Sequence, residues 1–155
     1  MITSKSAPVF GGVYKLVAIE NENGEITPKI KLSENISKIT NPHFKKVYRL
    51  YDKETGKAIA DELCLYDTTK EHTIFDPNAT WKQKTLTNFT ARELQVPIFK
   101  NGECVYESPS IEEIKAYCQK EVETLWDEVK RFENPHRYYV DLSQKLWDIK
   151  KELCV

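Results

Sequence analysis

Apolar and polar residues alternate in short runs over the first part of the chain, a pattern typical of β-strands. The first predicted strand is Gly12–Ile19, and a short half-buried strand is predicted over Lys29–Leu32. Two longer strands are predicted over 46–51 and 58–66, because Val, Ile, Leu and Tyr are frequent in both. The polar residues 52–57 between them predict the tip of a hairpin.

A second hairpin is predicted farther along the chain, with strands over 93–99 and 104–106. The pair Asn101-Gly102 separates them, and a type I′ turn favours Asn-Gly because both central residues need a positive φ. Residues 67–80 contain an Asp-Pro-Asn breaker and are predicted to be the least structured stretch. A further strand is predicted over 85–89.

The period of the apolar residues changes near residue 110. Spacings of three and four predict one long amphipathic helix that ends at Asn134-Pro135. Its start is predicted either at Ser108-Pro109, where proline suits the first turn, or at Ser110, in a capping box with Glu113. A second helix is predicted from Asp141 as N-cap residue. The two apolar stripes are Ile111, Ile114, Cys118, Val122, Leu125, Val129 and Phe132, and then Leu142, Leu146, Ile149 and Leu153.

Strands first and helices last indicate the α+β class, with antiparallel strands and hairpins followed by two packed C-terminal helices. Trp126 and Trp147 are predicted to pack between these helices. The length of 155 residues indicates a single domain over 1–155, with a β-rich part over 28–107 and a helical part over 108–155. Residues 1–20 supply an apolar strand with nothing before it to bury it, so we expect this segment to belong to a larger sheet or barrel.

The charge balance is even, with 23 basic and 24 acidic residues and a net charge of -1. We therefore expect neither nucleic acid nor a membrane as a partner. No segment reaches the roughly 20 apolar residues that a spanning helix needs, and no signal peptide precedes Pro8. Scattered cysteines without a Cys-x-x-Cys pair are typical of free buried thiols, so a cytoplasmic location is expected. The cysteines are Cys64, Cys104, Cys118 and Cys154.

Candidate chemistry is sparse. Gly11-Gly12 could let backbone N–H groups approach a phosphate, but we favour a tight turn or close strand packing as the reason for the pair. Lys15 either holds an anion at the mouth of a barrel or lies on a solvated face, and the sequence leaves both open. A group of lysines suggests an anion-binding loop or, as the preferred interpretation, a solvated one. These lysines are Lys29, Lys31, Lys38, Lys45 and Lys46.

The three histidines are interpreted as ordinary surface residues, because none has a second ligand or a nucleophile at a suitable spacing. The sequence therefore predicts no catalytic residue, no metal site and no cradle for ATP in this chain. The histidines are His43, His72 and His136.

The segment Pro8–Ala18, with its Gly-Gly-Val-Tyr-Lys-Leu-Val string, resembles the corresponding segment of nicotinate phosphoribosyltransferases. The resemblance covers essentially the whole chain. One departure is His43, which stands where the family usually has Gly after Pro, and it puts the local turn in question. The other segments that carry the resemblance are 28–33, 38–42, 46–51, 90–97 and 106–109.

The resemblance implies an enzyme that joins nicotinic acid to phosphoribosyl pyrophosphate, giving nicotinate mononucleotide and pyrophosphate in NAD salvage. It implies a step driven by ATP hydrolysis through a phosphorylated histidine. The implied fold is that of the type II phosphoribosyltransferases, an irregular α/β barrel plus a second domain built from both chain ends. The first strand would then be left over from the parent α/β barrel. The phosphorylated histidine, the nicotinate-binding arginine and the glycine-rich phosphate loop are all expected upstream of Met1.

The resemblance also gives six candidates for a place near the substrate. Their expected roles are supporting ones, beside the phosphate loop and on the strand that follows it. We expect a C-terminal structural domain that is inactive alone, with the remainder of the enzyme as its partner and a homodimer in the complete protein. ATP, phosphoribosyl pyrophosphate and Mg²⁺ are expected of the parent enzyme and not of this chain. The alternatives are a free-standing anion- or nucleotide-binding module and a protein-interaction module. The six candidates are Thr3, Ser4, Lys5, Gly11, Gly12 and Lys15.

Overall fold

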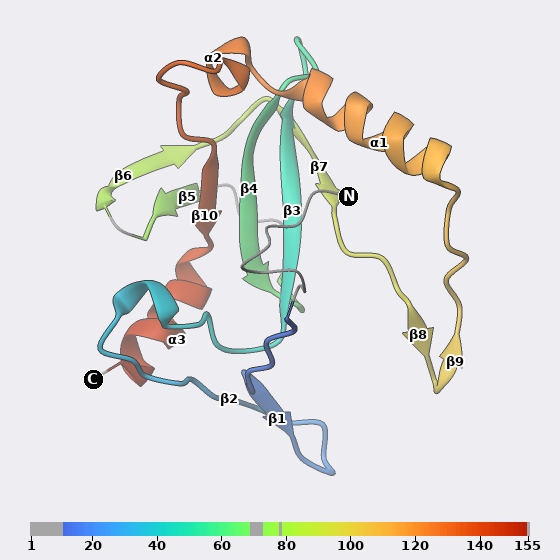
Figure 1. The fold of residues 1–155 in the computed structure, drawn as a ribbon. Helices are drawn as coiled ribbons and strands as arrows, with labels where there is room; N and C mark the ends of the chain where they lie inside the picture. Colours follow the sequence, from blue (N-terminus) through green and yellow to red (C-terminus); the bar gives the residue numbers. More distant parts are fainter. Residues whose placement is uncertain (1–10, 69–72, 78, 155) are drawn as a thin grey trace.

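A six-stranded sheet lies at the centre of the computed structural model, which describes residues 11–68, 73–77 and 79–154 (Figure 1). Its strands lie in the order β6-β5-β10-β4-β3-β7. Neighbouring strands are antiparallel except β10 and β4, which are parallel. This mixture of antiparallel strands and C-terminal helix confirms the predicted α+β class. The strands are β3 (Lys45–Asp52), β4 (Ala58–Leu65), β5 (Thr73–Asp76), β6 (Ala79–Thr85), β7 (Phe89–Glu93) and β10 (Tyr139–Leu142).

The β3–β4 hairpin agrees with the sequence prediction, and its tip is the polar segment after Asp52. The carboxylate of Asp52 accepts hydrogen bonds from the backbone N of Glu54 and Thr55, at 3.0 and 2.8 Å. Gly56 completes the turn with a φ of 69°. Side-chain capping by Asp and a positive-φ Gly are both local signals, which is why this turn could be predicted.

The β5–β6 hairpin contradicts the prediction of little structure over 67–80. It forms because Ile74 and Phe75 are both buried, and as neighbours in a strand they point to opposite faces of the sheet. The strand predicted over 85–89 is also wrong, since β6 ends at Thr85 and β7 begins at Phe89.

Two apolar clusters form the core. Helix α3 (Gln144–Leu153) contributes to the second, and the buried Ser143 caps this helix by accepting a hydrogen bond from Leu146 N at 3.4 Å. The predicted N-cap residue, Asp141, lies instead in β10, so the predicted helix start is two residues too early. The clusters are Leu50, Ala60, Ile74 and Leu86, and then Leu65, Phe75, Leu142 and Leu146.

The chain before the central sheet holds one short hairpin. β1 (Ala18–Glu20) pairs with β2 (Ile26–Pro28) across a turn whose glycine, Gly24, has a φ of 79°. The predicted strands Gly12–Ile19 and Lys29–Leu32 are therefore wrong in their bounds. Proline at the end of β2 removes a hydrogen-bond donor, which is consistent with the strand ending there.

Residues 11–16 lie outside any strand, contrary to the prediction of a buried strand. Val13 and Tyr14 are 86% and 87% exposed. A strand needs a hydrogen-bonded neighbour, and among the described residues no backbone group pairs with this segment. That the segment is left over from a parent barrel stays a prediction.

The hairpin predicted around Asn101-Gly102 is confirmed. β8 (Phe99–Lys100) pairs with β9 (Glu103–Cys104), and Asn101 and Gly102 have φ values of 52° and 83°. Both values are positive, as a type I′ turn requires. The strands are shorter than predicted, and the hairpin projects away from the central sheet (Figure 1).

Two helices, α1 (Ile111–Thr124) and α2 (Asp127–Lys130), stand where the sequence predicts a single long helix. Glu113 N donates to Ser110 Oγ at 3.3 Å, and Ser110 N donates to Glu113 Oε2 at 2.7 Å. This capping box confirms the second of the two predicted starts.

The break between α1 and α2 is stabilised from outside the helix. Lys57, in the β3–β4 turn, donates its ammonium to the carbonyl oxygens of Glu123 and Leu125, at 2.8 and 3.2 Å. A cation at the C-terminal end of a helix satisfies carbonyl groups that have no partner within the helix. The helix therefore ends at a point that its own sequence does not mark.

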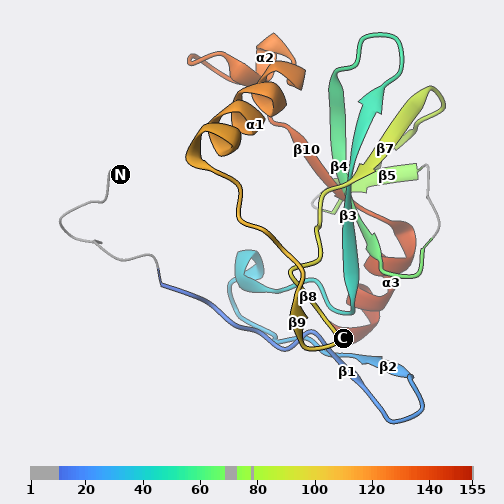
Figure 2. The ribbon, with the colours of Figure 1, turned by 90° about the vertical axis from the view of Figure 1, so that its right-hand side faces the viewer.

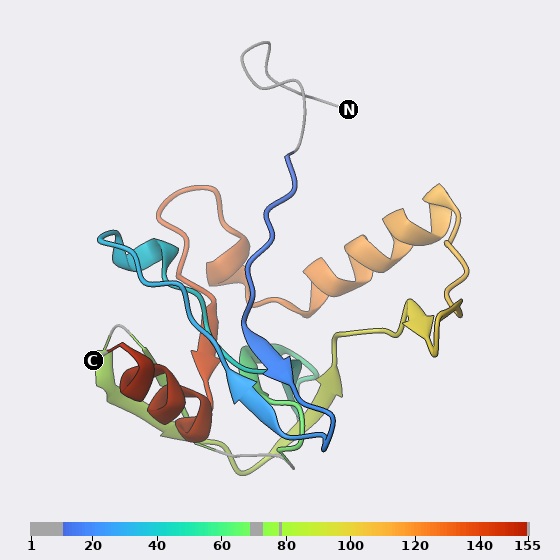
Figure 3. The ribbon, with the colours of Figure 1, turned by 90° about the horizontal axis from the view of Figure 1, so that it is seen from below.

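Helices α1 and α3 lie at opposite ends of the sheet, so the predicted packing of two helices is wrong (Figures 1 and 3). Trp147 packs edge-on against Phe75, with 5.8 Å between ring centroids, and Trp126 is 41% exposed. None of the described residues of α1 is buried. The predicted helical part over 108–155 also supplies the strand β10.

No disulfide joins the four cysteines, which all lie in the described part of the chain, and only Cys64 among them is buried. Cys104, Cys118 and Cys154 are exposed, so the expectation of buried thiols holds for Cys64 alone. None of the helices described is both long enough and apolar enough to cross a bilayer.

Candidate functional site

The described part of the structure assigns no role to five of the six predicted substrate-proximal residues. Thr3, Ser4 and Lys5 lie outside the described residues. Gly11 and Gly12 are exposed, and a Cβ atom on either would meet no atom within 4 Å. Close strand packing at this pair is therefore not seen among the described residues, and a place near the substrate stays a prediction for all five.

The sixth residue, Lys15, contacts the loop that follows β2. Its Nζ donates to the carbonyl oxygen of Lys38 at 3.0 Å, at the end of the short 3-10 helix η1 (Ile36–Lys38). The ammonium group therefore has a main-chain acceptor within this chain. A role for Lys15 toward a substrate stays a prediction.

Two of the five clustered lysines are occupied by contacts within the chain. Lys45 donates to the carbonyl oxygens of Asn41, Pro42 and His43, at 2.8, 3.2 and 2.6 Å, and burial lowers the pKa of Lys45. The Lys46 ammonium pairs with the Glu93 carboxylate at 3.2 Å and lies 4.5 Å from the centre of the Tyr66 ring. These contacts favour a structural use of the lysines over an anion-binding loop.

The strongest cluster of charges joins β3 and β4. Arg49 donates from Nε and Nη2 to the two carboxylate oxygens of Asp61, at 2.8 and 2.9 Å. Tyr138 donates its hydroxyl to the same carboxylate at 3.0 Å, and burial together with the charge of Asp61 raises the pKa of Tyr138. The Arg49 and Asp61 side chains are 19% and 12% exposed, so this pair is screened less than a surface pair.

Glu121 extends the cluster to helix α1. Its Oε2 accepts hydrogen bonds from Arg49 Nη1 at 3.0 Å, Arg92 Nη2 at 2.5 Å and the Tyr51 hydroxyl at 3.3 Å. The hydrogen bond from Arg92 is the main reason why the pKa of Glu121 is lowered. We call these six residues the α1 latch: Arg49, Tyr51, Asp61, Arg92, Glu121 and Tyr138.

The latch predicts an acid-dependent stability. We expect Glu121→Gln to lower the free energy of unfolding at neutral pH by about 1.5 kcal/mol. Because the pKa of Glu121 is lower in the folded than in the unfolded chain, its contribution is present above about pH 4.3 and is lost as the pH falls through the folded pKa. The difference between variant and parent chain should therefore shrink in acid.

Urea unfolding at several pH values between about pH 7 and about pH 3 measures this difference. Glu123→Gln, on the exposed part of the same helix, is the matched control and should give a small difference at every pH. A Glu121→Gln difference that is independent of pH would show that the carboxylate charge is not what holds the helix.

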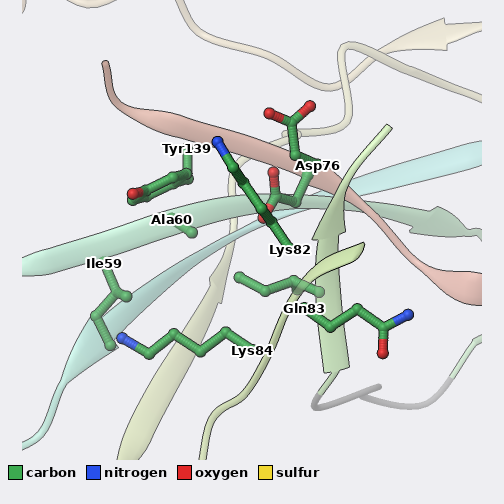
Figure 4. Close-up of a pocket in the computed structure, with 9 residues that line it drawn as sticks. Ile59, Ala60, Asp76, Lys82, Gln83, Lys84 and Tyr139 are labelled. Atoms are coloured by element: carbon green, nitrogen blue, oxygen red, sulfur yellow. The ribbon is translucent and has the colours of Figure 1, made fainter. Parts of the chain in front are cut away.

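A pocket of about 330 Å³ lies beside β4, β10 and the β5–β6 hairpin (Figure 4). Asp141 lines it and is 7% exposed, and burial, with a smaller contribution from the Asp76 carboxylate, raises the pKa of Asp141. Figure 4 shows the Lys82 side chain crossing the pocket between Tyr139 and Asp76. No histidine, serine or cysteine lines this pocket, so it offers no pair of nucleophile and base.

No three His, Cys, Asp or Glu side chains come together as metal ligands within 11–68, 73–77 and 79–154. His43 and His136 lie in loops, and His72 lies outside the described residues. His43 has a φ of 74°, a backbone region that favours glycine, and its Nδ1 accepts a hydrogen bond from Phe44 N at 2.9 Å. His43, the residue at which this chain departs from the family it resembles, therefore has a backbone conformation that suits the family's glycine.

A family model described as "Nicotinate phosphoribosyltransferase C-terminal domain" matches residues 44–150. The match runs from the start of β3 almost to the end of α3. It therefore includes the central sheet and every residue of the α1 latch.

Curated relatives named nicotinate phosphoribosyltransferase are similar over nearly the whole chain. The Bacillus subtilis protein is 40% identical over 156 aligned positions, which cover 98% of this chain and 32% of the relative. The Caenorhabditis elegans protein is 32% identical, covering 95% and 26%, and the human protein is 29% identical, covering 99% and 28%. The chain thus spans about a third or less of the length of these relatives.

A solved structure also shares the fold. The crystal structure of human nicotinic acid phosphoribosyltransferase matches with a TM-score of 0.72 over 94% of this chain and 27% of that chain. The sequence identity in this match is 24%, so the comparison shows a common fold.

Proposed function

This chain belongs to the nicotinate phosphoribosyltransferase family, in which it matches the C-terminal domain, and we propose that it is a structural domain of such an enzyme and is inactive alone. The observation that carries the proposal is the coverage of the relatives: nearly all of this chain matches less than a third of the human protein. Its role is to complete and stabilise the larger enzyme.

The charges of the described residues support this scaffold role. Arg49 and Arg92, which could otherwise hold a phosphate, both bind Glu121 of the same chain. Lys45 binds three carbonyl oxygens. Cations paired within the chain in this way stabilise the fold, and this pairing competes with the binding of a substrate anion.

The complete enzyme, in this proposal, joins nicotinate to phosphoribosyl pyrophosphate with ATP, yielding nicotinate mononucleotide for NAD salvage. In the same proposal, ATP, phosphoribosyl pyrophosphate and Mg²⁺ bind to the remainder of the enzyme and not to this chain. The complete enzyme is proposed to be a cytoplasmic homodimer.

An activity assay tests the proposal. This chain alone, given nicotinate, phosphoribosyl pyrophosphate, ATP and Mg²⁺, should form no nicotinate mononucleotide. Mixed with the part of the Bacillus subtilis relative that precedes the matched region, it should restore product formation that neither piece shows alone. The C-terminal region of that relative, added to the same part, is the positive control.

Turnover by this chain alone would refute the scaffold role. Saturable binding of phosphoribosyl pyrophosphate to this chain alone, followed by calorimetry, would instead favour a free-standing anion-binding module. The pairing of Arg49, Arg92 and Lys45 within the chain leads us to expect no such binding.

A further inference from the structure

We propose that the groove beneath helix α1 receives a segment from the remainder of the enzyme. The groove lies between α1 and the β3–β7 edge of the sheet and has a volume of about 520 Å³. The inference rests on the proposed function, and it adds the surface through which the domain docks. Apolar residues and a cysteine line the groove, together with three residues of the latch. They are Leu94, Ile114, Tyr117, Cys118, Val122 and Leu125, and the latch residues Arg49, Glu121 and Tyr138.

The first observation is that α1 has no core of its own. Ile114 and Val122 belong to the predicted apolar stripe, yet they are 51% and 46% exposed, and Tyr117 beside them is 57% exposed. A helix of 14 residues is marginal in water without packing of its apolar face. The stripe therefore lacks the apolar contacts that would normally stabilise such a helix.

The second observation is that polar contacts hold α1 in place. Glu121 binds Arg49, Arg92 and Tyr51, and Lys57 binds the carbonyl groups at the helix end. These contacts fix the position of the helix over the sheet while its apolar side chains stay uncovered. The groove is thus formed before anything fills it, and a preformed site costs less to occupy.

The third observation concerns which occupant fits. The relatives carry a larger part beyond the matched region, and the matched family is a C-terminal domain, so that part precedes it. Figures 2 and 3 both show the segment that starts at residue 11 leaving the sheet on the side where α1 lies. A preceding chain that joins there lies on the same side of the sheet as the exposed α1 stripe, next to the exposed Val13 and Tyr14. We therefore choose the remainder of the enzyme over a second copy of this domain.

Two exposed thiols provide the test. Cys118 lies in the groove, and Cys154 lies at the end of α3, at the opposite end of the sheet. Alkylation of both is followed by peptide mass spectrometry, with and without the preceding part of the Bacillus subtilis relative. Assembly should slow the alkylation of Cys118 by about tenfold or more and change that of Cys154 by less than about twofold.

A charge placed in the groove gives an independent readout. Ile114→Glu should weaken assembly by about tenfold or more, because it buries a carboxylate without a partner. Ile36→Glu, at a residue that is 78% exposed and outside the groove, is the matched control and should leave assembly unchanged. Both variants are first checked for native circular dichroism.

The outcomes separate the docking surface from the function. Restored activity with Cys118 still reactive and Ile114→Glu neutral overturns the groove as docking surface and leaves the proposed function standing. Protection of Cys118 that rises with the concentration of this chain alone shows that a second copy fills the groove, which also overturns the inference. No assembly and no activity, with the positive control working, overturns both.

Discussion

Phe75→Ala is expected to lower the free energy of unfolding by about 4 kcal/mol. Phe75 is 1% exposed, packs edge-on against Trp147 and belongs to the cluster of Leu142 and Leu146. It therefore joins the β5–β6 hairpin to β10 and α3. Domains of this size are typically stable by about 5–15 kcal/mol, so the loss is a large share of the total.

Urea unfolding followed by circular dichroism measures the change. Phe132→Ala, at a residue that is 100% exposed, is the matched control and should change the free energy by less than about 0.5 kcal/mol. If Phe75→Ala does not fold, Phe75→Leu should still fold, with a loss of about 1 kcal/mol. A loss below about 1 kcal/mol for Phe75→Ala would show that the hairpin is not part of the cooperative core.

The hairpin that carries Phe75 is also where sequence reasoning fails most clearly. The Asp-Pro-Asn run after Phe75 is a breaker by composition, yet the strands β5 and β6 on either side of it pair, because Ile74 and Phe75 are buried on opposite faces of the sheet. The partner of Phe75 is Leu142, far away in the sequence. Burial against a distant partner outweighs local turn composition, and no local pattern reveals it.

Elements fixed by local chemistry are the ones that could be predicted. The Asn101-Gly102 turn and the Ser110–Glu113 capping box depend on residues a few positions apart, and both are confirmed. The end of α1 depends on Lys57 from another turn, and the sequence places it too late. Parallel pairing of β10 with β4 likewise has no local signature.

The α1 latch falls between these cases. Arg49 and Asp61 lie on the two strands of the predicted hairpin, so their proximity could have been expected, but their direct pairing depends on a register shift between Leu50 and Tyr51 that the predicted turn does not give. The part played by Glu121 could not have been expected, because it depends on where the last turns of α1 meet the sheet. The candidates suggested by family resemblance, from Gly11 to Lys15, gain no further support from the geometry of this chain.

Arg49→Met is expected to cost about 3 kcal/mol of the free energy of unfolding. The side chain makes two hydrogen bonds to Asp61 and one to Glu121, and its aliphatic replacement leaves both largely buried carboxylates with fewer partners. Arg137→Met, at a side chain that is 70% exposed, is the matched control and should cost less than about 1 kcal/mol. Amide exchange along α1 should rise in Arg49→Met and stay unchanged in Arg137→Met.

The double variant Arg49→Met with Asp61→Leu decides the reason for that cost. If the penalty comes from a buried carboxylate that loses its partner, removing the carboxylate as well should recover at least about 1 kcal/mol relative to Arg49→Met. If the two single costs simply add, the arginine stabilises the sheet through its packing, and the ion pair is incidental. Because the double variant still lacks the hydrogen bond from Arg49 to Glu121, α1 should stay loosened in amide exchange while the recovered stability appears in urea unfolding.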